Sequence, residues 1–301
     1  MISVAVDWGS SSFRAYRFDS KANCIDSVQS DKGIKFVASG HFESVLREQI
    51  GQWLCPGDTV LFSGMITSRN GWVESEYLPC PANLACLVEH GRRLSLADME
   101  CIFLPGVNQL APADVMRGEE LQILGALEGL GPQHFVIPGT HSKWSLIENG
   151  AVQQFRTIPT GELFDLVVNH SLMGALTRSG VFDEAAFARG VEVGHESSTP
   201  ISDLFTTRSS VLMGLQRDEE AHSWLSGMLI GNEIREGRMM METIDSTVVL
   251  IGDERLCHRY LRAFGVLGMP VELAGPDVAV SGYQKIIRHE SGVNQGLLEI
   301  I

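Results

Sequence analysis

Two short turns rich in glycine and small hydroxyl residues are the first places in this chain that could bind phosphate. Gly9-Ser10-Ser11-Ser12 and Gly139-Thr140-His141-Ser142 each follow one apolar run and precede another. A glycine in such a turn lets backbone N–H groups approach an anion closely. Either turn alone is typical of an ordinary hairpin. Their recurrence at matching positions favours a pair of phosphate-binding turns.

Charged residues stand beside both turns. Asp7 ends the first apolar run, where a carboxylate could hold Mg²⁺ and offset the charge of nucleotide phosphates; capping of the turn is its alternative role. Arg14 could make a charge-assisted contact with phosphate, or could be a solvent-exposed strand residue. Lys143 directly follows the second turn and could contact phosphate as well.

A candidate general base lies in the acidic segment between residues 114 and 125. The segment predicts a helix with a buried stripe of leucines, Leu121, Leu124 and Leu127. The positive end of a helix dipole favours an ionised carboxylate, which is the form that accepts a proton from an attacking hydroxyl. Ordinary helix capping is the alternative. Three carboxylates remain candidates: Glu119, Asp114 and Glu120.

The segment Arg69-Asn70-Gly71-Trp72 is the candidate site for an acidic substrate. Arg69 could pair with a substrate carboxylate, Asn70 could bind hydroxyls, and Trp72 could pack on a carbon chain. Asn-Gly is also a common turn sequence, so an ordinary surface loop is the alternative.

The elements expected around these residues repeat one plan. Each phosphate turn lies inside a three-stranded meander, predicted at Ile2–Val6, Phe13–Phe18 and Ile25–Val28 and again at Phe135–Ile137, Trp144–Ile147 and Val152–Ile158. This internal duplication predicts two lobes with a ligand cleft between them. Proline and glycine near residues 105–112 place the boundary, giving an N-terminal lobe of 1–110 and a C-terminal lobe of 111–301.

Helices and single strands fill the rest of the chain. Between the meanders we expect a helix at Phe42–Leu54, a strand at Thr59–Ser63 and an irregular stretch at 69–81. Later elements are helices at 162–177, 183–189, 202–216, 219–236 and 254–264, a strand at 247–251, and a last helix after Pro276. That last helix is free to pack back on the N-terminal lobe.

Composition narrows the function classes. A net charge of -14 over 301 residues argues against a nucleic-acid or anionic-membrane surface, which needs a basic footprint. The N-terminus does not read as a signal peptide, and no uncharged run is long enough to span a bilayer. The six cysteines are scattered without metal spacing, so we expect free thiols in the cytoplasm.

The chain resembles the phosphotransferases that share a fold with actin, hexokinase and the heat-shock chaperone ATPases. Those proteins carry an Asp-x-Gly-Ser/Thr turn, a second Gly-Thr turn and a late strand-Gly-helix element, which match Asp7–Ser11, Gly139–Trp144 and Val248–Asp253 here. The resemblance implies an α/β fold of two actin-like lobes, built from duplicated ribonuclease H-like mixed sheets flanked by helices.

Longer segments resemble the 2-dehydro-3-deoxygalactonokinase family from end to end: VDWGSSSFRAYRF, FSGMITSRNGWVESEYLPCPA, FLPGV, DVMRGEELQILGAL, PGTHSKW and LSGMLIGNEI. This implies transfer of the ATP γ-phosphoryl group to the 6-hydroxyl of 2-dehydro-3-deoxy-D-galactonate, in galactonate breakdown. ATP and Mg²⁺ are then the expected nucleotide and metal, and a small sugar acid is the expected partner. The sequence allows a homodimer.

The family pattern carries over residue by residue. Asp7, Gly9, Ser10 and Ser11 match the first phosphate turn, Gly139 and Thr140 the second, and Gly252 the adenosine turn. Two departures stand out. Related carbohydrate kinases begin the base-bearing helix with Gly-Asp-Gln-Gln, whereas this chain has Gly118-Glu119-Glu120. Many relatives have paired glycines where this chain has Gly252-Asp253.

Two other functions stay open at this point. One is a kinase of the same architecture that acts on another sugar or anhydro-sugar. The other is a non-catalytic, actin-like nucleotide-binding switch, against which the chain offers no long additional substrate-binding region.

Overall fold

The computed structural model describes residues 2–96, 98–129, 131, 133–177, 181–240, 246–275 and 277–291. Contacts divide the chain into two compact units. The first consists of Met1–Pro132, Ile147–Phe155 and Gly275–Ile301, and the second of Gln133–Leu146 and Arg156–Ala274. The lobe boundary predicted at residue 110 stays a prediction, as does the cleft.

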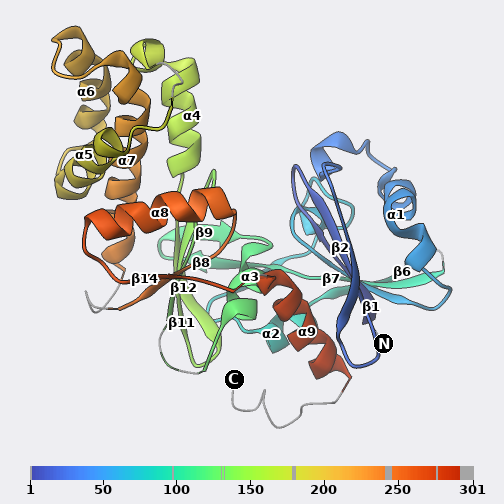
Figure 1. The fold of residues 1–301 in the computed structure, drawn as a ribbon. Coiled ribbons are helices and arrows are strands. Elements are labelled where there is room, and N and C mark those ends of the chain that lie inside the picture. Colours follow the sequence, from blue (N-terminus) through green and yellow to red (C-terminus); the bar gives the residue numbers. More distant parts are fainter. Residues whose placement is uncertain are drawn as a thin grey trace. The chain divides into compact units, whose positions relative to one another are not determined.

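A six-stranded mixed sheet organises the first unit, with the strand order β3-β2-β1-β4-β7-β6 (Figure 1). Its strands are β1 (Ile2–Trp8), β2 (Phe13–Phe18), β3 (Cys24–Ser30), β4 (Thr59–Ser63), β6 (Arg92–Leu96) and β7 (Met99–Phe103). The first three form the predicted antiparallel meander, and β1 pairs in parallel with β4. The carboxyl ends of β1 and β4 therefore meet at one edge of the sheet.

Helix α1 (Phe42–Ile50) covers part of this sheet through a stripe at helical spacing. Its buried residues Phe42, Leu46 and Ile50 join one core cluster with Trp8 and Phe62. The helix was predicted to reach Leu54, but a 3₁₀ turn (Gly51–Trp53) ends it earlier. The core thus forms directly beside the first phosphate turn, because Trp8 is the last residue of β1.

A small sheet of three strands was not predicted. It has the order β5-β8-β9 and consists of β5 (Tyr77–Pro79), β8 (Gly106–Leu110) and β9 (Ala113–Met116). The stretch 69–81 is therefore not wholly irregular, and Asp114 lies on a strand instead of in the first turn of a helix. A short helix, α2 (Leu84–Glu89), precedes β6.

Helices α3 (Glu119–Ala126) and α9 (Val278–Glu290) pack against each other in the first unit. A side chain at Gly125 would lie 2.1 Å from the carbonyl oxygen of Val278, so the two backbones touch. Lys285 donates to the carbonyls of Leu124, Gly125 and Leu127 at 2.9–3.1 Å and so caps the C-terminal end of α3. The leucines predicted as its buried stripe are buried.

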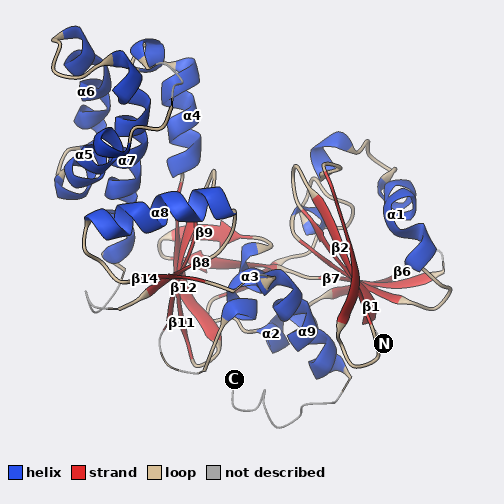
Figure 2. Ribbon diagram, in the orientation of Figure 1, coloured by secondary structure: helices blue, strands red, loops and turns tan. Residues whose placement is uncertain are grey.

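A five-stranded sheet with the order β12-β11-β10-β13-β14 organises the second unit (Figure 2). Residues 147–155, at the end of β11 and in most of β12, belong to the first unit. The strands are β10 (Gln133–Ile137), β11 (Ser142–Glu148), β12 (Ala151–Ile158), β13 (Val248–Leu250) and β14 (Val271–Leu273). Parallel pairing of β10 with β13 repeats that of β1 with β4. The repeated meander predicted from the sequence is therefore present in both sheets.

Five helices complete the second unit: α4 (Thr160–His170), α5 (Glu184–Glu196), α6 (Pro200–Leu212), α7 (Asp218–Arg238) and α8 (Glu254–Val266). Helix α4 is shorter than predicted and α5 is longer. Helices α5 and α7 approach closely at glycines, because side chains at Gly190 and Gly227 would each lie 2.1 Å from a carbonyl oxygen of the other helix. This packing buries most of α7.

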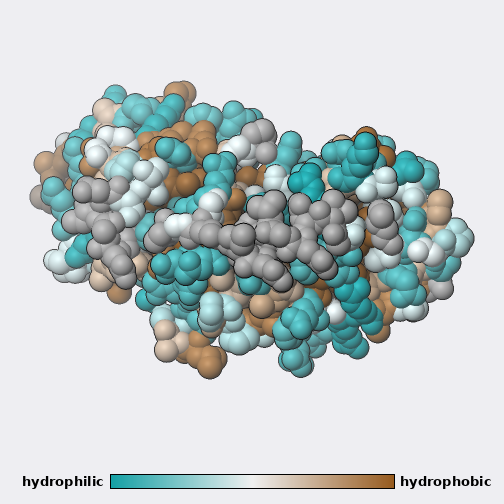
Figure 3. Space-filling view, turned by 90° about the horizontal axis from the view of Figure 1, so that it is seen from below, coloured by the Kyte–Doolittle hydropathy of each residue, from teal (hydrophilic) through white to brown (hydrophobic). Residues whose placement is uncertain are grey.

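The described surface mixes polar and apolar residues, as Figure 3 shows for one face of the molecule. Exposed hydrophobic side chains such as Leu110, Leu172 and Val181 are common on globular proteins. Among the described residues, no helix combines the length and apolar character needed to cross a membrane. All six cysteines are free thiols, as predicted.

Candidate active site

The first glycine turn is an exposed, braced loop between β1 and β2. Gly9 N–H donates to the Ser12 carbonyl at 2.9 Å, and Ser10 and Ser11 face solvent. Residues 33–35 support the turn from behind: Ile34 N–H donates to the Gly9 carbonyl at 3.0 Å, and a side chain at Gly33 would overlap Ser10. The turn is therefore held in place while its outer residues stay accessible.

Asp7 lies at the carboxyl end of β1, next to this turn. Its carboxylate pairs with Arg14 at 3.3 Å, and its side chain is 15% exposed. Burial raises the pKa of Asp7, Arg14 opposes that rise, and the nearby charge of Glu119 adds to it. A cation at this place would favour the ionised carboxylate.

Two glycines bring the start of α3 to Asp7. A side chain at Gly64, directly after β4, would lie 3.0 Å from Asp7 Oδ1, and one at Gly118 would lie 3.2 Å from Gly64 Cα. Both glycines have positive φ, 84° and 104°. Larger residues would be strained here and would push the segments apart. The sequence therefore folds so that Glu119 begins its helix near Asp7.

The three candidate bases have different surroundings. Glu119 is partly exposed and accepts from Arg117 N–H at 2.9 Å. Glu120 is 1% exposed and accepts from Gly118 N–H at 2.7 and 2.8 Å. Asp114 lies on β9, where its Oδ1 accepts from the N–H of the next residue. Glu119 is thus the carboxylate of the three that combines access with the neighbourhood of Asp7.

Burial, followed by the charge of Glu119, raises the pKa of Glu120 from 4.5 to about 8. The folded protein then keeps a proton that the unfolded chain releases above pH 4.5. The free energy of unfolding should fall as the pH rises from about 4.5 to about 8, at up to about 1.4 kcal/mol per pH unit from this group.

Glu120→Gln removes this titration with little change in shape. We expect the stability of the variant relative to the natural protein to improve steadily between pH 5.5 and pH 8, measured from urea unfolding midpoints at several pH values. A difference that stays constant over this range would contradict the raised pKa of Glu120.

Arg117 is a functional candidate that the sequence-based analysis missed. Its guanidinium is buried and donates to Thr67 O and Oγ1 at 2.7 and 2.6 Å and to Ser75 O at 2.9 Å. It also lies over the Tyr77 ring, 4.3 Å from the centroid. Arg117 directly precedes Gly118, so its side chain ties the loop after β4 to the start of α3.

That loop contains the candidate sugar-acid residues. Arg69 and Asn70 are exposed, with no ion pair or side-chain hydrogen bond to other described residues. Trp72 is partly buried and packs against the aromatic core, with ring centroids 5.6 Å from Phe62 and 5.9 Å from Phe103. Two of the three residues thus present polar groups to solvent, while the third anchors the loop.

The second glycine turn repeats the first in the other unit. Thr140 and His141 are exposed, and Gly139 N–H donates to Ser142 Oγ at 3.3 Å. Helix α4 supports the turn: Glu162 N–H donates to the Thr140 carbonyl at 3.0 Å, and a side chain at Gly161 would lie 2.5 Å from Gly139 O.

The side chains of His141, within this turn, and of Lys143, directly after it, already have hydrogen-bond partners. His141 Nε2 lies 2.7 Å from Glu162 Oε2. The Lys143 ammonium donates to Thr157 Oγ1 at 2.7 Å, and this residue is 6% exposed. Lys143 is therefore part of the sheet interior in this structure.

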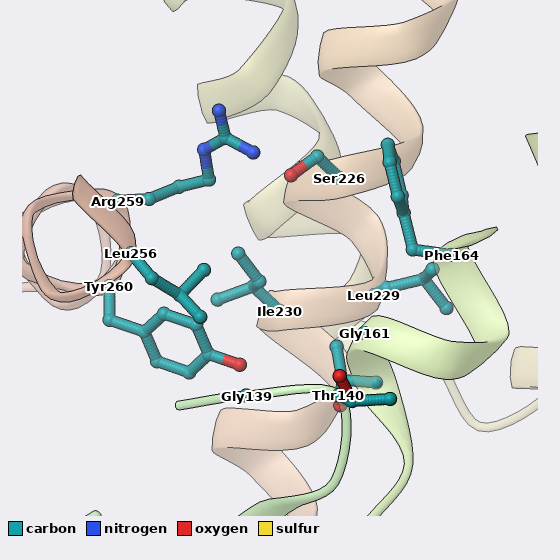
Figure 4. A pocket seen from close by; sticks show the side chains of 11 residues that line it. Gly139, Thr140, Gly161, Phe164, Ser226, Leu229, Ile230, Leu256, Arg259 and Tyr260 are labelled. Carbon is teal, nitrogen blue, oxygen red and sulfur yellow. The ribbon is translucent and has the colours of Figure 1, made fainter. Parts of the chain in front are cut away.

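A cavity of about 190 Å³ opens beside the second turn (Figure 4). Gly139 and Thr140 form one side and helices α4, α7 and α8 the others; the remaining lining residues are Thr160, Gly161, Phe164, Ser226, Leu229, Ile230, Leu256, Arg259 and Tyr260. Aliphatic and aromatic walls with a few polar groups suit a planar heterocycle. The apolar residues of this cavity were not predicted, because their helical stripes look like ordinary core.

Gly252 and Asp253 directly precede helix α8, which forms one wall of this cavity. Gly252 has φ 130°, and Asp253 Oδ1 caps the helix by accepting from Leu256 N–H at 3.0 Å. Asp253 therefore has a capping role where many related kinases have a glycine.

Asp7 is the residue of this site that could bind a magnesium ion, provided that nucleotide phosphates supply most of the other ligands. The described residues hold no group of three or more metal-binding side chains. Mg²⁺ commonly binds through one or two carboxylates together with substrate phosphates and water. The single, partly exposed carboxylate of Asp7 beside an exposed anion-binding turn matches that donor set.

Comparisons with known proteins identify relatives of this chain. The model of the family 2-keto-3-deoxy-galactonokinase matches residues 7–286. The 2-dehydro-3-deoxygalactonokinase of Escherichia coli is 33% identical over 289 residues, covering 95% of this chain and 97% of that protein. The crystal structure of a protein described as a 2-dehydro-3-deoxygalactonokinase from Sinorhizobium meliloti superposes with a TM-score of 0.89 at 31% identity, over 95% of this chain and 98% of that one.

A more distant structure shows the wider fold. The xylulose kinase of Lactobacillus acidophilus superposes with a TM-score of 0.54 at 8% identity, over 99% of this chain and 91% of that chain. The fold class predicted from the sequence, that of the actin-like ATPases and sugar kinases, is therefore confirmed.

Proposed function

Since this chain belongs to the 2-keto-3-deoxy-galactonokinase family, we propose that it transfers the γ-phosphoryl group of ATP to the 6-hydroxyl of 2-dehydro-3-deoxy-D-galactonate. The hydroxyl oxygen forms a bond to the γ-phosphorus while the bond to the β-phosphate oxygen breaks. The products are the 6-phosphorylated sugar acid, ADP and one proton. The single observation that carries the proposal is the match to the family along nearly the whole chain.

The first unit supplies the base and the acceptor site in this proposal. Glu119 takes the proton of the attacking hydroxyl, since its carboxylate is partly exposed and lies near Asp7. Arg69 pairs with the carboxylate of the sugar acid and Asn70 binds its hydroxyls. Trp72 and Arg117 support the loop that carries these two residues. A base contributes about 10²–10⁴-fold to such a reaction.

The phosphate turns bind the nucleotide. The exposed residues Ser10 and Ser11, together with Gly9 and Arg14, contact phosphate at the first turn. The exposed residues Thr140 and His141, together with Gly139 and the buried Ser142, form the second turn. The cavity beside the second turn receives the adenine. Gly252, which precedes the helix that carries the lining residues Leu256 and Tyr260, is the candidate residue for the adenosine turn. Lys143 is a weaker candidate than its neighbours, because its ammonium donates to Thr157.

Asp7 would hold the magnesium ion of Mg-ATP, directly or through water. When bound, the ion neutralises phosphate charge and polarises the γ-phosphoryl group. The Arg14 guanidinium, 3.3 Å from Asp7, favours the ionised carboxylate and opposes the larger effect of burial, which raises the pKa of Asp7. Positioning and charge neutralisation then supply most of the acceleration.

A panel of acceptors tests the assignment. ADP production would be followed by a coupled assay with keto-deoxy sugar acids, aldonates, neutral sugars and anhydro-sugars. We expect kcat/KM for 2-dehydro-3-deoxy-D-galactonate to exceed that for neutral sugars at least about tenfold, because a neutral sugar lacks the charge-assisted hydrogen bonds to Arg69, which contribute about 1.5–3 kcal/mol.

Other outcomes identify the alternatives. Equal or better turnover of a neutral sugar or an anhydro-sugar would make the protein a related sugar kinase. Slow ATP hydrolysis that no acceptor accelerates would make it a nucleotide-binding switch. The use of ATP supports a cytoplasmic site of action, and the homodimer stays a prediction.

A further inference from the structure

A buried carboxylate in the second unit has no part in the roles assigned so far. Glu233 lies on α7 and is 1% exposed. Its Oε1 accepts from Trp144 Nε1 at 2.9 Å, and its Oε2 accepts from Tyr260 Oη at 2.5 Å. The hydroxyls of Thr160 and Ser142 also hydrogen bond to it. Strands and helices that are far apart in the sequence, namely β11, α4, α7 and α8, meet at this one side chain.

Burial raises the pKa of Glu233, and the hydrogen bonds that it accepts oppose this rise by favouring the ionised form. An ionised carboxylate is an acceptor only, and an indole N–H is a donor only. Tyr260 gives its hydroxyl proton to Glu233. The single hydroxyl proton of Ser142 then goes either to Glu233 or to Tyr260 Oη, 3.2 Å away, so Ser142 donates toward the carboxylate in both cases. Ser142 Oγ in turn accepts from Gly139 N–H at 3.3 Å. The carboxylate therefore sets the direction of every hydrogen bond in the series that ends at the second phosphate turn.

A buried carboxylate is costly unless it is fully hydrogen bonded, and apolar side chains would fill the same space at less cost. Three of its four partners here lie on the second turn or line the adjacent cavity, and the fourth, Trp144, lies on β11. Thr160 and Tyr260 line that cavity, and Ser142 closes the turn. Such a network has the form expected of support for a binding site.

We propose that Glu233 is a positioning residue for the nucleotide. Acting through Tyr260 and Ser142, it holds the turn Gly139–Ser142 in the conformation that binds phosphate. This inference rests on the proposed function, because it assumes that the second turn binds ATP.

The test compares three variants with the natural enzyme. Glu233→Gln puts an NH₂ group where two donors converge, and Tyr260→Phe removes the hydroxyl while keeping the ring that lines the cavity. We expect each to raise the Kd and the KM for ATP about tenfold or more, because a hydrogen bond to a charged group is lost. The KM for the sugar acid should stay within about twofold. Calorimetric titration gives the Kd without turnover.

Trp144→Phe is the matched control. It removes a donor from the same buried carboxylate, but Trp144 has no hydrogen bond to the turn. We expect it to lower the melting temperature as much as Tyr260→Phe does, while the Kd for ATP stays within about twofold. If Glu233→Gln fails to fold, the comparison of Tyr260→Phe with Trp144→Phe decides the matter alone.

Three results would overturn the inference. Unchanged ATP affinity in both Glu233→Gln and Tyr260→Phe would show that the carboxylate does not position the turn. An equal loss of ATP and sugar-acid affinity in all three variants would show general destabilisation. Failure of the natural protein to bind ATP in the titration would remove the proposed function and this inference together.

Discussion

Glu119→Gln is expected to lower kcat at least about a hundredfold and to leave the affinity for ATP nearly unchanged. The amide keeps the size of the side chain, and its oxygen can still accept from Arg117 N–H, which the carboxylate does at 2.9 Å. The helix start is therefore preserved, and what is lost is the ability to take a proton. Steady-state kinetics gives kcat, and titration calorimetry gives the Kd for ATP.

The two rival carboxylates are tested in the same way. Asp114→Asn and Glu120→Gln should each cost less turnover than Glu119→Gln, since Asp114 lies on β9 and Glu120 is 1% exposed. Glu148→Gln, at an exposed strand end, controls for the loss of one negative charge. If Glu119→Gln keeps the kcat of the natural enzyme, the base is Asp114 or Glu120, whichever gives the larger loss of kcat when it is substituted.

Asp7→Asn is expected to lower kcat/KM for ATP about a hundredfold, equivalent to roughly 3 kcal/mol of transition-state stabilisation. The Mg²⁺ concentration that gives half the maximal rate should rise at least about tenfold, because an amide binds this ion more weakly than a carboxylate does. Asparagine has the same shape and can still accept from Arg14, so the end of β1 should be unaltered. Initial rates measured over a Mg²⁺ series at fixed ATP provide the readout.

Asp19→Asn is the matched control for this change. Asp19 lies in the next turn of the same meander, where it accepts from Lys21 N–H and Asn23 N–H at 2.8 Å. The variant removes a negative charge at the opposite end of β2 without touching the first turn, so the Mg²⁺ requirement should stay as in the natural enzyme. A Mg²⁺ requirement that is unaltered in Asp7→Asn would exclude Asp7 as a ligand.

The repeated meander was predictable because its signals are local. Strand periodicity, glycine turns and acidic strand ends all lie within a few residues of one another, so Phe13–Phe18 and Thr59–Ser63 were predicted at their observed bounds. The same exposure at both turns, with Ser10–Ser11 and Thr140–His141 facing solvent, follows from that local pattern.

What could not be predicted depends on distant partners. The strand β9 pairs with β8, and its acidic residue looked like the start of the helix that begins five residues later. Arg117 and Glu233 look like ordinary charged residues in the sequence, and their burial becomes visible only when Thr67 or Trp144 is placed beside them. The position of Glu233 one helical turn from Leu229 and Ile230 and next to Ile234 was an available signal of its burial.

Strand β1 and helix α9 are far apart in the sequence but belong to the same unit. The unit can therefore be completed only after α9 has been synthesised. Tyr283 on α9 hydrogen bonds to Ser63 at 2.5 Å, across 220 residues, and Gly282 packs against Leu121. Contacts so distant in sequence form late and slowly. A nascent chain that has not yet reached residue 278 lacks the helix that covers α3 and leaves its leucines open to chaperones. A chain that stops before residue 278 would therefore contain the first-made strands without the helix that completes their unit.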